Sequence, residues 1–433
     1  MTRTPDRIVI LNDRSIMTGG ASNLACLSAQ LLEAAGCAVT FFAGDGEGAF
    51  TPARQTIWVG GRPLTEQSRL SALSRGLYNP RAAEKLNRFI TQHDTPATIY
   101  HVHGWSKILS PSIFRVLARV RERTVLHAHD YFLACPNGGF VNFRSQTVCG
   151  LAPLSVRCLA SRCDKRGQHE KAWRLARHEL RERFFPVRRQ AANIVLIHEG
   201  MSDYFLRAGV RGGLMRAIRN PVEPFLWPTA RPWAGDAVYF IGRLEPEKGF
   251  EDAAIAARLA GARLHVIGDG AGRSLLQRKY PEVVIHGWKA RSEIGPLLNK
   301  ARAVVVASRV PEPFGLVAVE AVGSGIPVIL PDAALLAPEI VDHGCGLTFK
   351  SGNPASLAAA IGEILRDDGK VRHMSASALL AAPGMALTSR SWGEALTSLY
   401  AEVLERTRPV AAQSAPRAVP IPPFETAGLP GGR

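Results

Sequence analysis

Residues 308–321 read SRVPEPFGLVAVEA, and they follow directly on a short apolar run at Ala303–Ala307. A buried strand, a turn and a helix that opens at Gly315 are the simplest structure for this pattern. The start of such a helix exposes the unpaired N–H groups of Phe314, Gly315 and Leu316. These groups can bind a phosphate or the hydroxyls of a sugar.

Two carboxylates lie within this strand–turn–helix unit. Glu312 falls in the turn, and Glu320 lies about one and a half turns into the helix. A carboxylate is a natural acceptor for the vicinal hydroxyls of a ribose or hexose. Acidic residues are also common at helix starts because they interact favourably with the helix dipole, so the pair alone indicates a sugar site only weakly.

Apolar runs and helical patterns alternate in both directions from this unit. Helices are predicted at Ser22–Ala34 and Ser112–Arg121, where apolar residues recur every three or four positions. The predicted strands are Arg7–Leu11, Val39–Ala43, Thr98–Val102, Val125–His129 and Ile194–Ile197 in the first half, and Ala237–Ile241, Leu264–Ile267, Val283–Ile285, Ala303–Ala307 and Pro327–Leu330 in the second. This alternation predicts an α/β protein with two doubly wound parallel sheets. Ligands of such sheets bind at the carboxyl ends of the strands.

A proline-rich stretch at residues 220–228 separates the two halves and suits an extended linker. The final helical pattern is centred on Trp392–Glu405, and the sequence beyond it is rich in Pro, Ala and Gly. We therefore expect a first domain at residues 1–215, a second at 216–388, a C-terminal helix at 389–406 that crosses back to the first domain, and a disordered tail at 407–433.

The chain has 433 residues, of which 46% are hydrophobic, and this length suits two domains of roughly 200 residues each. Its first residues lack the pattern of a secretory signal. No apolar stretch approaches the roughly 18 residues of a membrane-spanning helix. We expect a cytoplasmic enzyme.

The formal net charge of +16 is compatible with nucleic acid, an anionic membrane surface or phosphorylated small molecules as partners. Arginines concentrate between Arg157 and Arg189, where Trp173, Phe184 and Phe185 are interspersed. This segment could form a basic amphipathic face on anionic lipid, although a solvated arginine-rich helix has the same composition. The chain has no zinc-finger spacing or RNA-binding motif, so nucleic acid is not an expected partner.

Four of the seven cysteines fall within an insertion at residues 133–166, which is longer than this type of fold requires. These are Cys135, Cys149, Cys158 and Cys163. Four thiols in such proximity could bind zinc, or form disulfides under oxidising conditions, but they include no CxxC pair. Unligated thiols in a structural insertion are the alternative interpretation.

Three glycine-containing loops follow predicted strands and would therefore reach the cleft. Gly19-Gly20 precedes a helix whose N-terminus could approach an anion. Residues 242–249, GRLEPEKG, place Arg243 and Lys248 where two cations could bind a diphosphate. Gly268 starts a turn of sequence GDG that lacks the glycine spacing of a dinucleotide fingerprint. A tight turn explains Gly19-Gly20 equally well, and a surface turn with ordinary exposed charges is the alternative for GRLEPEKG. The GDG turn is expected to shape the pocket for the base or the sugar.

Taken in order, these motifs resemble those of the retaining glycosyltransferases of family 4, the glycogen-synthase-like group 1 enzymes with the GT-B fold. The most specific element is the pair of glutamates separated by seven residues in EPFGLVAVEA, and GRLEPEKG, VIGDG and GIPVILPD support it. The resemblance extends from Gly19-Gly20 to the final helix. It implies two Rossmann-like domains that face a central cleft, the first binding an acceptor and the second a nucleotide-sugar donor.

The resemblance also implies roles for the matching positions. Arg243 and Lys248 would neutralise the donor diphosphate as it leaves, which is electrostatic catalysis that needs no metal or other cofactor. Consistently, the sequence contains no Asp-X-Asp pair. Glu312 would contact the donor sugar and Glu320 the ribose. The complete expected donor-binding set is Gly19, Gly20, Arg243, Lys248, Gly268, Glu312, Phe314, Gly315, Leu316 and Glu320.

The resembling family also places a histidine of the first domain beside the sugar, and two histidines here follow adjacent predicted strands. His103, in YHVHGW, matches the family motif better, so we expect it to act in catalysis with Arg243, Lys248 and Glu312. His129, in HAHD, is expected on the acceptor side, where Asp130 would orient it or contact a hydroxyl. A histidine at a strand end is more often structural, but four histidines within thirty residues favour a site.

The expected reaction transfers a hexose-type sugar from a nucleotide diphosphate sugar to a glycan or lipid-linked acceptor in cell-envelope or exopolysaccharide biosynthesis. A front-face mechanism, in which the leaving diphosphate helps to deprotonate the acceptor, would retain the anomeric configuration. This mechanism needs no protein nucleophile, and Glu312 is the second-best candidate for that role. The cysteine insertion would select the acceptor, contact the inner face of a membrane, or serve only as structure.

Other activities remain compatible with the same motifs. A nucleotide-sugar epimerase or hydrolase and a glycogen-phosphorylase-like enzyme share the two-domain architecture. A non-catalytic sugar-binding protein is a further alternative, although both the cations and the acids that the reaction needs are present.

Overall fold

The computed structural model describes residues 4–17, 19–48, 50–226 and 230–407. Trp227 and Pro228 of the expected linker lie outside the described residues, as does the expected tail from residue 408 onward.

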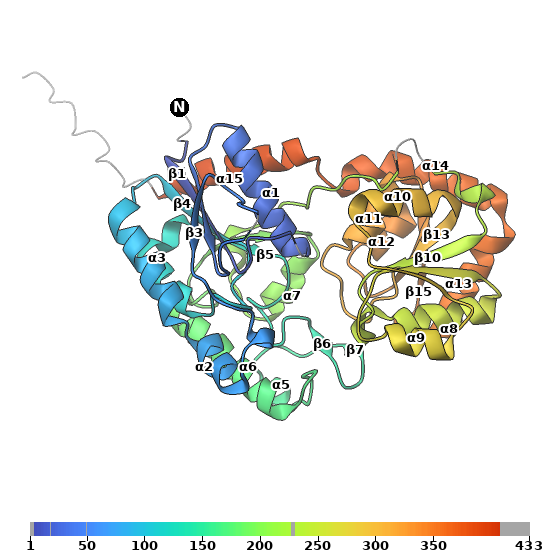
Figure 1. The fold of residues 1–433 in the computed structure, drawn as a ribbon, viewed down its shortest axis with the longest axis horizontal. Coiled ribbons are helices and arrows are strands. Elements are labelled where there is room, and N and C mark those ends of the chain that lie inside the picture. Colours follow the sequence, from blue (N-terminus) through green and yellow to red (C-terminus); the bar gives the residue numbers. More distant parts are fainter. Residues whose placement is uncertain (1–3, 18, 49, 227–229, 408–433) are drawn as a thin grey trace, which may run out of the picture.

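The first half of the chain forms a seven-stranded sheet in the order β3-β2-β1-β4-β5-β8-β9, and all of its neighbouring strands are parallel (Figure 1). The strands are β1 Arg7–Asn12, β2 Val39–Ala43, β3 Gln55–Trp58, β4 Thr98–Val102, β5 Thr124–Ala128, β8 Asn193–Leu196 and β9 Met215–Ala217. The sheet therefore extends to Ala217, two residues beyond the expected domain boundary.

The second half forms a six-stranded parallel sheet in the order β12-β11-β10-β13-β14-β15. Its strands are β10 Ala237–Ile241, β11 Arg263–Ile267, β12 Val284–Gly287, β13 Ala301–Val305, β14 Val328–Pro331 and β15 Gly346–Phe349. The predicted α/β architecture of two doubly wound parallel sheets is confirmed.

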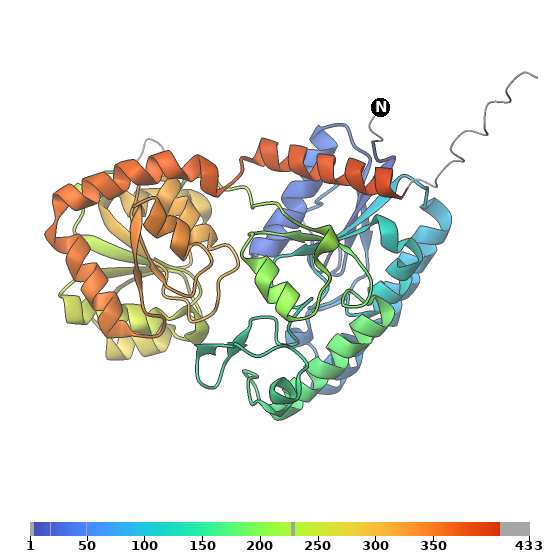
Figure 2. The ribbon, with the colours of Figure 1, turned by 180° about the vertical axis from the view of Figure 1, so that it is seen from behind.

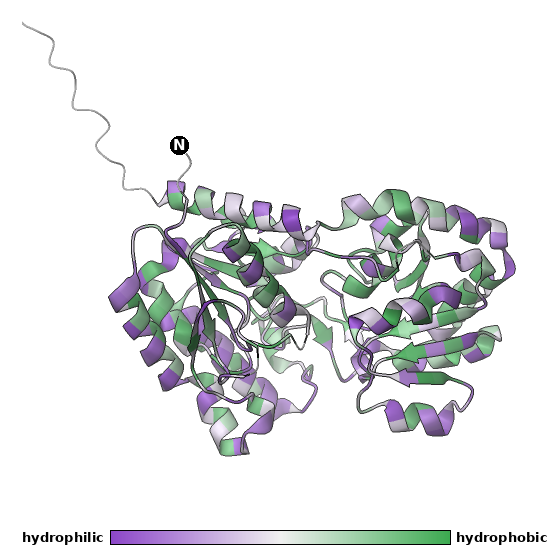
Figure 3. Cartoon of the chain, turned by 45° about the horizontal axis from the view of Figure 1, so that its top comes forward, coloured by the Kyte–Doolittle hydropathy of each residue, from purple (hydrophilic) through white to green (hydrophobic). Residues whose placement is uncertain are grey.

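Helices cover both faces of each sheet, and Figure 3 shows apolar strands inside with polar residues on the outer faces of the helices. In the first half the helices are α1 Gly20–Ala34, α2 Arg69–Leu77, α3 Pro80–His93, α4 Ser112–Leu117, α5 Val156–Ala160, α6 Gln168–Phe184 and α7 Met201–Arg207. In the second they are α8 Phe250–Ala260, α9 Arg273–Lys279, α10 Arg291–Leu297, α11 Leu316–Gly323, α12 Ala337–Asp342, α13 Pro354–Arg366 and α14 Asp368–Met385.

The last described helix, α15 Ser389–Arg406, crosses back to the first domain and packs against α1 (Figure 2). Its buried Trp392 and Tyr400 join the core formed by Ile8 and Ile10 of β1. The chain crosses between the domains twice, and the two crossing segments pair: Val222 N–H donates to Leu387 O at 3.0 Å.

The cysteine insertion extends from the first domain toward the second (Figure 1). It contains an antiparallel hairpin of β6 Val141–Asn142 and β7 Thr147–Val148, followed by α5. Lys165, near its end, forms ion pairs with Glu245 at 2.9 Å and Glu247 at 3.0 Å in the second domain. The insertion therefore contacts the GRLEPEKG loop across the cleft.

Candidate donor site in the interdomain cleft

A cavity of about 400 Å³ lies between the domains, at the carboxyl ends of strands from both sheets. Nine of the residues singled out in the sequence line it: Gly19, Gly20, His129, Arg243, Lys248, Glu312, Phe314, Gly315 and Leu316. Loops from both sheets meet here because parallel strands present their carboxyl ends to the same edge. The cavity is thus the place where the two domains can hold one ligand together.

Glu312 forms the centre of a polar cluster on the second-domain side of the cavity. Lys248 Nζ forms an ion pair with Glu312 Oε1. Ser308 Oγ, near the start of the loop that carries Glu312, donates to that oxygen at 2.6 Å. An ammonium and a carboxylate are therefore held together at the cavity wall, 64 positions apart in the chain.

The electrostatic surroundings keep this carboxylate ionised. Burial alone would raise the pKa of Glu312, but the charge and hydrogen bond of Lys248, the Ser308 hydroxyl and the charge of Arg243 together lower the pKa below its ordinary value of 4.5. Near neutral pH the site therefore offers two cations and one anion.

The start of α11 reaches the same cavity. Gly315 caps this helix in a left-handed conformation with φ at +70°, which glycine adopts without steric cost. The first-domain loop approaches closely here, because a Cβ placed on Gly20 would lie 3.6 Å from Leu316 Cδ1. The helix N-terminus and the first-domain glycines thus face each other across a narrow gap.

Two further glycines fix the course of the loops around Lys248. Gly249 has φ at +68°, and a Cβ there would lie 1.9 Å from Ala307 O. A Cβ on Gly268 would lie 1.9 Å from Gly242 O. Gly268 does not line the cavity. Its close approach to Gly242 lets the third glycine loop pack directly against the turn that carries Arg243.

Glu320 does not line the cavity. It forms an ion pair with Arg291, whose guanidinium also donates to Glu223 O and lies 5.6 Å from the ring centroid of Phe225. Burial raises the pKa of Glu320 above 4.5 despite this partner. The two glutamates therefore differ. Glu312 is stabilised as an anion at the cavity, whereas burial disfavours the ionised form of Glu320.

The two candidate histidines lie one behind the other. His129 lines the cavity, and its Nε2 lies 3.0 Å from Nδ1 of His103. His103 is only 5% exposed and does not line the cavity. Asp130 is exposed, and its carboxylate accepts a hydrogen bond from Phe132 N–H at 2.9 Å. His129 can therefore contact a ligand in the cavity, whereas His103 can affect that ligand only through its contact with His129.

Three residues that sequence reasoning did not single out contribute to this region. Ser308 holds Glu312, and Arg291 holds Glu320. Asn220, from the first crossing segment, lines the cavity, and its buried Oδ1 has no hydrogen-bond partner among the described residues. The sequence indicates that Ser308 lies in a loop after a strand and Asn220 in a linker. It does not indicate which residues they contact, because those contacts depend on the tertiary fold.

The four thiols of the insertion do not form a metal-binding cluster within the described residues. Among the described residues, three potential metal ligands do lie close together: His101, His103 and His127. Burial and the neighbouring Cys163 raise the pKa of Cys135, while hydrogen bonds from backbone groups lower it, and the result is about 11. The Cys135 thiol therefore stays protonated near neutral pH.

Part of the arginine-rich segment is buried and does not form a surface. Arg181 on α6 is fully buried beside Glu182, and Arg177 lies 5.0 Å from the ring of Trp105. Of the interspersed aromatic residues, Phe185 is fully buried and Trp173 partly so. The aromatic side chains of this segment therefore pack inward.

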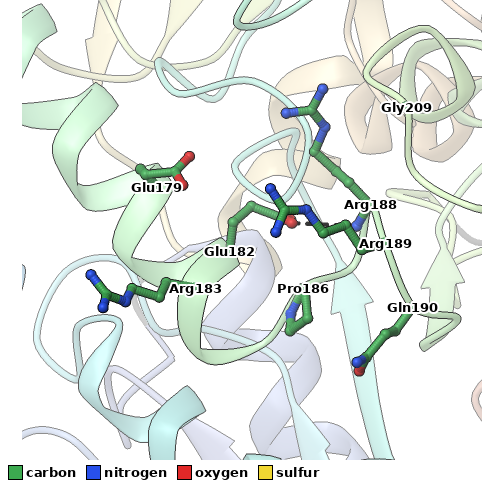
Figure 4. Close-up of a pocket in the computed structure, with 8 residues that line it drawn as sticks. All are labelled: Glu179, Glu182, Arg183, Pro186, Arg188, Arg189, Gln190 and Gly209. Atoms are coloured by element: carbon green, nitrogen blue, oxygen red, sulfur yellow. Dashed lines mark hydrogen bonds between the residues drawn. The ribbon is translucent and has the colours of Figure 1, made fainter.

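A second hollow, of about 710 Å³, lies where α6 ends (Figure 4). Arg183, Arg188 and Arg189 line it together with Glu179 and Glu182. Figure 4 shows the three guanidinium groups pointing in different directions. The mixed charges and the divergent arginines do not form a converging anion site.

No helix in the described part of the chain is long and apolar enough to cross a bilayer.

Two segments of the chain match known protein families. Residues 19–221 match the family described as Glycosyl transferase 4-like domain, and residues 231–379 match Glycosyl transferases group 1. A glycogen synthase from Mycobacterium tuberculosis H37Rv is 28% identical over 272 residues, which cover 59% of this chain and 63% of that protein. A GDP-mannose-dependent alpha-mannosyltransferase from M. tuberculosis CDC 1551 is 36% identical, over 31% of this chain and 35% of that protein.

Both matches cover less than two thirds of the relative's own length. Among solved structures, sucrose-phosphate synthase from Thermosynechococcus elongatus superposes with a TM-score of 0.68 at 18% sequence identity. The superposition covers 93% of this chain and 100% of that one. This likeness shows the shared fold.

Proposed function

The chain belongs to the group 1 glycosyltransferases with the GT-B fold, which depend on nucleotide sugars, and we propose that it transfers a hexose from a nucleoside diphosphate to a glycan or lipid-linked acceptor. The observation that carries this proposal is the cluster of Lys248, Glu312 and Ser308 in a cavity lined by both domains. Cell-envelope or exopolysaccharide assembly is the proposed pathway class.

In the proposed reaction Arg243 and Lys248 bind the diphosphate of the donor. The bond between the anomeric carbon and the phosphate oxygen breaks, and the two cations stabilise the negative charge that develops on that oxygen. When the donor enters, its phosphate would compete with Glu312 for Lys248. Glu312 would then be free to accept hydrogen bonds from hydroxyls of the transferred sugar.

The acceptor hydroxyl is proposed to attack from the face that the diphosphate leaves, so that the anomeric configuration is retained. Its proton passes to the departing phosphate oxygen. His129 is the first-domain side chain placed to contact the sugar or acceptor in the cavity, with His103 positioning it. Glu320 is proposed to hold the ribose once Arg291 gives way to it.

Donor binding is the direct test. Isothermal calorimetry with uridine and guanosine diphosphate sugars is expected to give binding for at least one sugar, and adding a glycan acceptor should give a product with the configuration of the donor. Release of free sugar or an epimer without an acceptor would support the hydrolase or epimerase alternative. The proposal fails if no nucleotide sugar binds.

Lys248→Ala should lower the turnover about a hundredfold, which is the typical effect of removing one preorganised charge that stabilises a leaving group. Lys350→Ala is the matched control, because Lys350 is an exposed lysine that follows β15 in the same domain. Equal turnover in both variants would remove Lys248 from the mechanism.

A peripheral membrane contact forms a second part of the proposal. Four apolar side chains at one end of the first domain are exposed: Leu70 (82%) and Leu73 (41%) on α2, and Val156 (82%) and Leu159 (49%) on α5. Exposed arginines accompany them, among them Arg69 and Arg157. Apolar side chains beside basic ones are the composition with which a surface helix binds anionic lipid.

Vesicle sedimentation tests this contact. Vesicles with anionic headgroups should bind the protein more strongly than neutral vesicles, and the double variant Leu70→Ser/Val156→Ser should bind less. Leu380→Ser, on α14 of the second domain, is the control because Leu380 is 84% exposed. Equal loss of binding in the control would place the contact elsewhere or make it non-specific.

A further inference from the structure

A ladder of four histidines lies on one face of the first sheet, beneath α15. His101 lies in β4, and His127 lies in the neighbouring strand β5. His103 follows two residues after His101, and His129 follows two residues after His127. Because side chains two residues apart on a strand share a face, all four imidazoles point to the same side. His101 is fully buried, and His103 and His127 are 5% and 4% exposed.

Three of these rings converge. One ring nitrogen from each of His101, His103 and His127 lies within 4.8 Å of the others. The ring centroids are 4.2 Å apart for His101 and His103, 4.7 Å for His103 and His127, and 5.2 Å for His101 and His127. Nitrogens bound to one tetrahedral zinc ion lie about 3.3 Å apart. Small rotations of the rings would therefore bring the three nitrogens to coordination distance.

The hydrogen bonds inside the ladder leave buried nitrogens without partners. His103 Nε2 and His127 Nε2 are buried and have no hydrogen-bond partner among the described residues. Buried polar atoms are nearly always paired with protein, water or an ion, so these two nitrogens point to a missing ligand.

The remaining nitrogens of the three rings have partners. His101 Nε2 lies 3.2 Å from His127 Nδ1, and an ion bound by His101 Nε2 would replace this contact. Tyr400 Oη, from α15, lies 2.7 Å from His101 Nδ1, and His129 Nε2 lies 3.0 Å from His103 Nδ1. A second ring nitrogen held by an outer partner is the usual arrangement for a histidine that binds a metal, because it fixes the ring orientation. His129 also lines the interdomain cavity, which provides a path by which an ion could enter.

We propose that His101, His103 and His127 form a binding site for one transition metal ion, and that Zn²⁺ suits it best. Three neutral imidazoles favour zinc, copper or nickel over magnesium or calcium, which prefer oxygen ligands. The ion would tie β4 and β5 together beneath Tyr400 of α15. The ion would lie behind the wall of the donor cavity and would not contact the donor, so its binding can be measured without any sugar transfer.

Metal analysis of the full-length protein tests the site. Protein stripped with a chelator and then dialysed against Zn²⁺ should retain one ion per chain by mass spectrometry of the metal. Co²⁺ in place of Zn²⁺ should give the visible bands of a histidine site without the near-ultraviolet band of a cobalt–thiolate bond. Retention of no metal would overturn the proposal, because a buried water would then satisfy the nitrogens. A thiolate band would also overturn it, because the cysteine insertion would then hold the ion.

Variants locate the ion. His127→Gln should abolish the retained metal, and Tyr400→Phe should weaken its affinity about 10- to 100-fold, the usual effect of losing an outer partner of a ligand. His286→Gln is the matched control, since His286 Nε2 lies 3.0 Å from His265 Nδ1 in a histidine pair of the second domain.

Metal retained at one equivalent by a folded His127→Gln would overturn the assignment. If that variant does not fold, unchanged affinity in Tyr400→Phe would overturn it. Cys149→Ser should keep the ion, which separates the ladder from the cysteine insertion.

Discussion

Gly249→Ala should damage both stability and catalysis, whereas the equivalent change at Gly261 should affect stability alone. The two glycines flank α8 and have nearly the same backbone conformation, with φ at 68° and 65° and ψ at 25° for both. An alanine in this left-handed region costs roughly 1–2 kcal/mol at either position. Because this backbone cost is the same in both variants, a difference in stability between them reflects only the surroundings of the new methyl group.

The surroundings of the two glycines differ. A Cβ at position 249 would lie 1.9 Å from Ala307 O, whereas no atom of the described residues would lie within 4 Å of a Cβ at position 261. Relieving such an overlap adds about 1–3 kcal/mol, as for other overpacked sites, so the total for Gly249→Ala is about 2–5 kcal/mol. The loop that must shift carries Lys248, and a displacement near 1 Å at a catalytic group costs about a hundredfold in rate.

Urea unfolding and initial rates of sugar transfer measure the two effects. Gly261→Ala should lower the free energy of unfolding by roughly 1–2 kcal/mol with turnover unchanged. Gly249→Ala should lose more free energy and also turnover. Equal losses of stability in the two variants, or unchanged turnover in Gly249→Ala, would refute the role assigned to the contact with Ala307 O.

Two further predictions concern charges at the cleft. The pKa of Glu312 is lowered, so its ionised form stabilises the fold above pH 4.5 and this contribution is lost as pH falls through the lowered value. Glu312→Gln should therefore destabilise the protein at neutral pH and converge with the wild type in acid, whereas Glu320→Gln should be neutral or stabilising at neutral pH because the pKa of Glu320 is raised. Urea unfolding at neutral pH and at about pH 3 checks both signs, and the same direction for both variants would contradict the electrostatic account. Lys165→Ala should change the stability by less than about 1 kcal/mol, since the pair with Glu245 and Glu247 is partly exposed, and the difference should shrink at high salt. Thermal unfolding at two salt concentrations measures it, and a large effect independent of salt would indicate a role in packing.

Central strands were predictable because their sequences are apolar throughout. The bounds of Val39–Ala43, Thr98–Val102 and Ala237–Ile241 match those in the structure. Strands buried on both faces carry this signal, and it does not depend on the partner strand. The edge strands β3, β9 and β15 were missed because they are short and partly exposed, which leaves no continuous apolar run.

The candidate site was predictable as a set of loops but not as a set of contacts. Position after a strand placed Arg243, Lys248 and Glu312 at the cleft, because the carboxyl ends of parallel strands share an edge. The ion pair between Lys248 and Glu312 joins loops from β10 and β13 and depends on their adjacency in the sheet. Strand order is a tertiary property that periodicity does not encode.

The histidine ladder illustrates the same limit. The spacing of two residues within YHVH and HAH implies a shared face for each pair, but the convergence of the pairs depends on the register of β4 with β5. The pairing of Glu320 with Arg291, which comes from α10, likewise depends on the tertiary fold. Residue spacing gives local faces, and tertiary neighbours decide which of them meet.

The return of α15 to the first domain has a consequence for the order of synthesis. One face of the first sheet is covered by Trp392, Leu396 and Tyr400, which the ribosome adds after the entire second domain. Until then α1 covers Ile8 and Ile10 without this second helix, so the first domain to be translated is the last to be completed. A chain truncated before α15 would leave the part of this apolar core that Trp392, Leu396 and Tyr400 cover exposed to solvent, and exposed apolar surface of this kind favours aggregation.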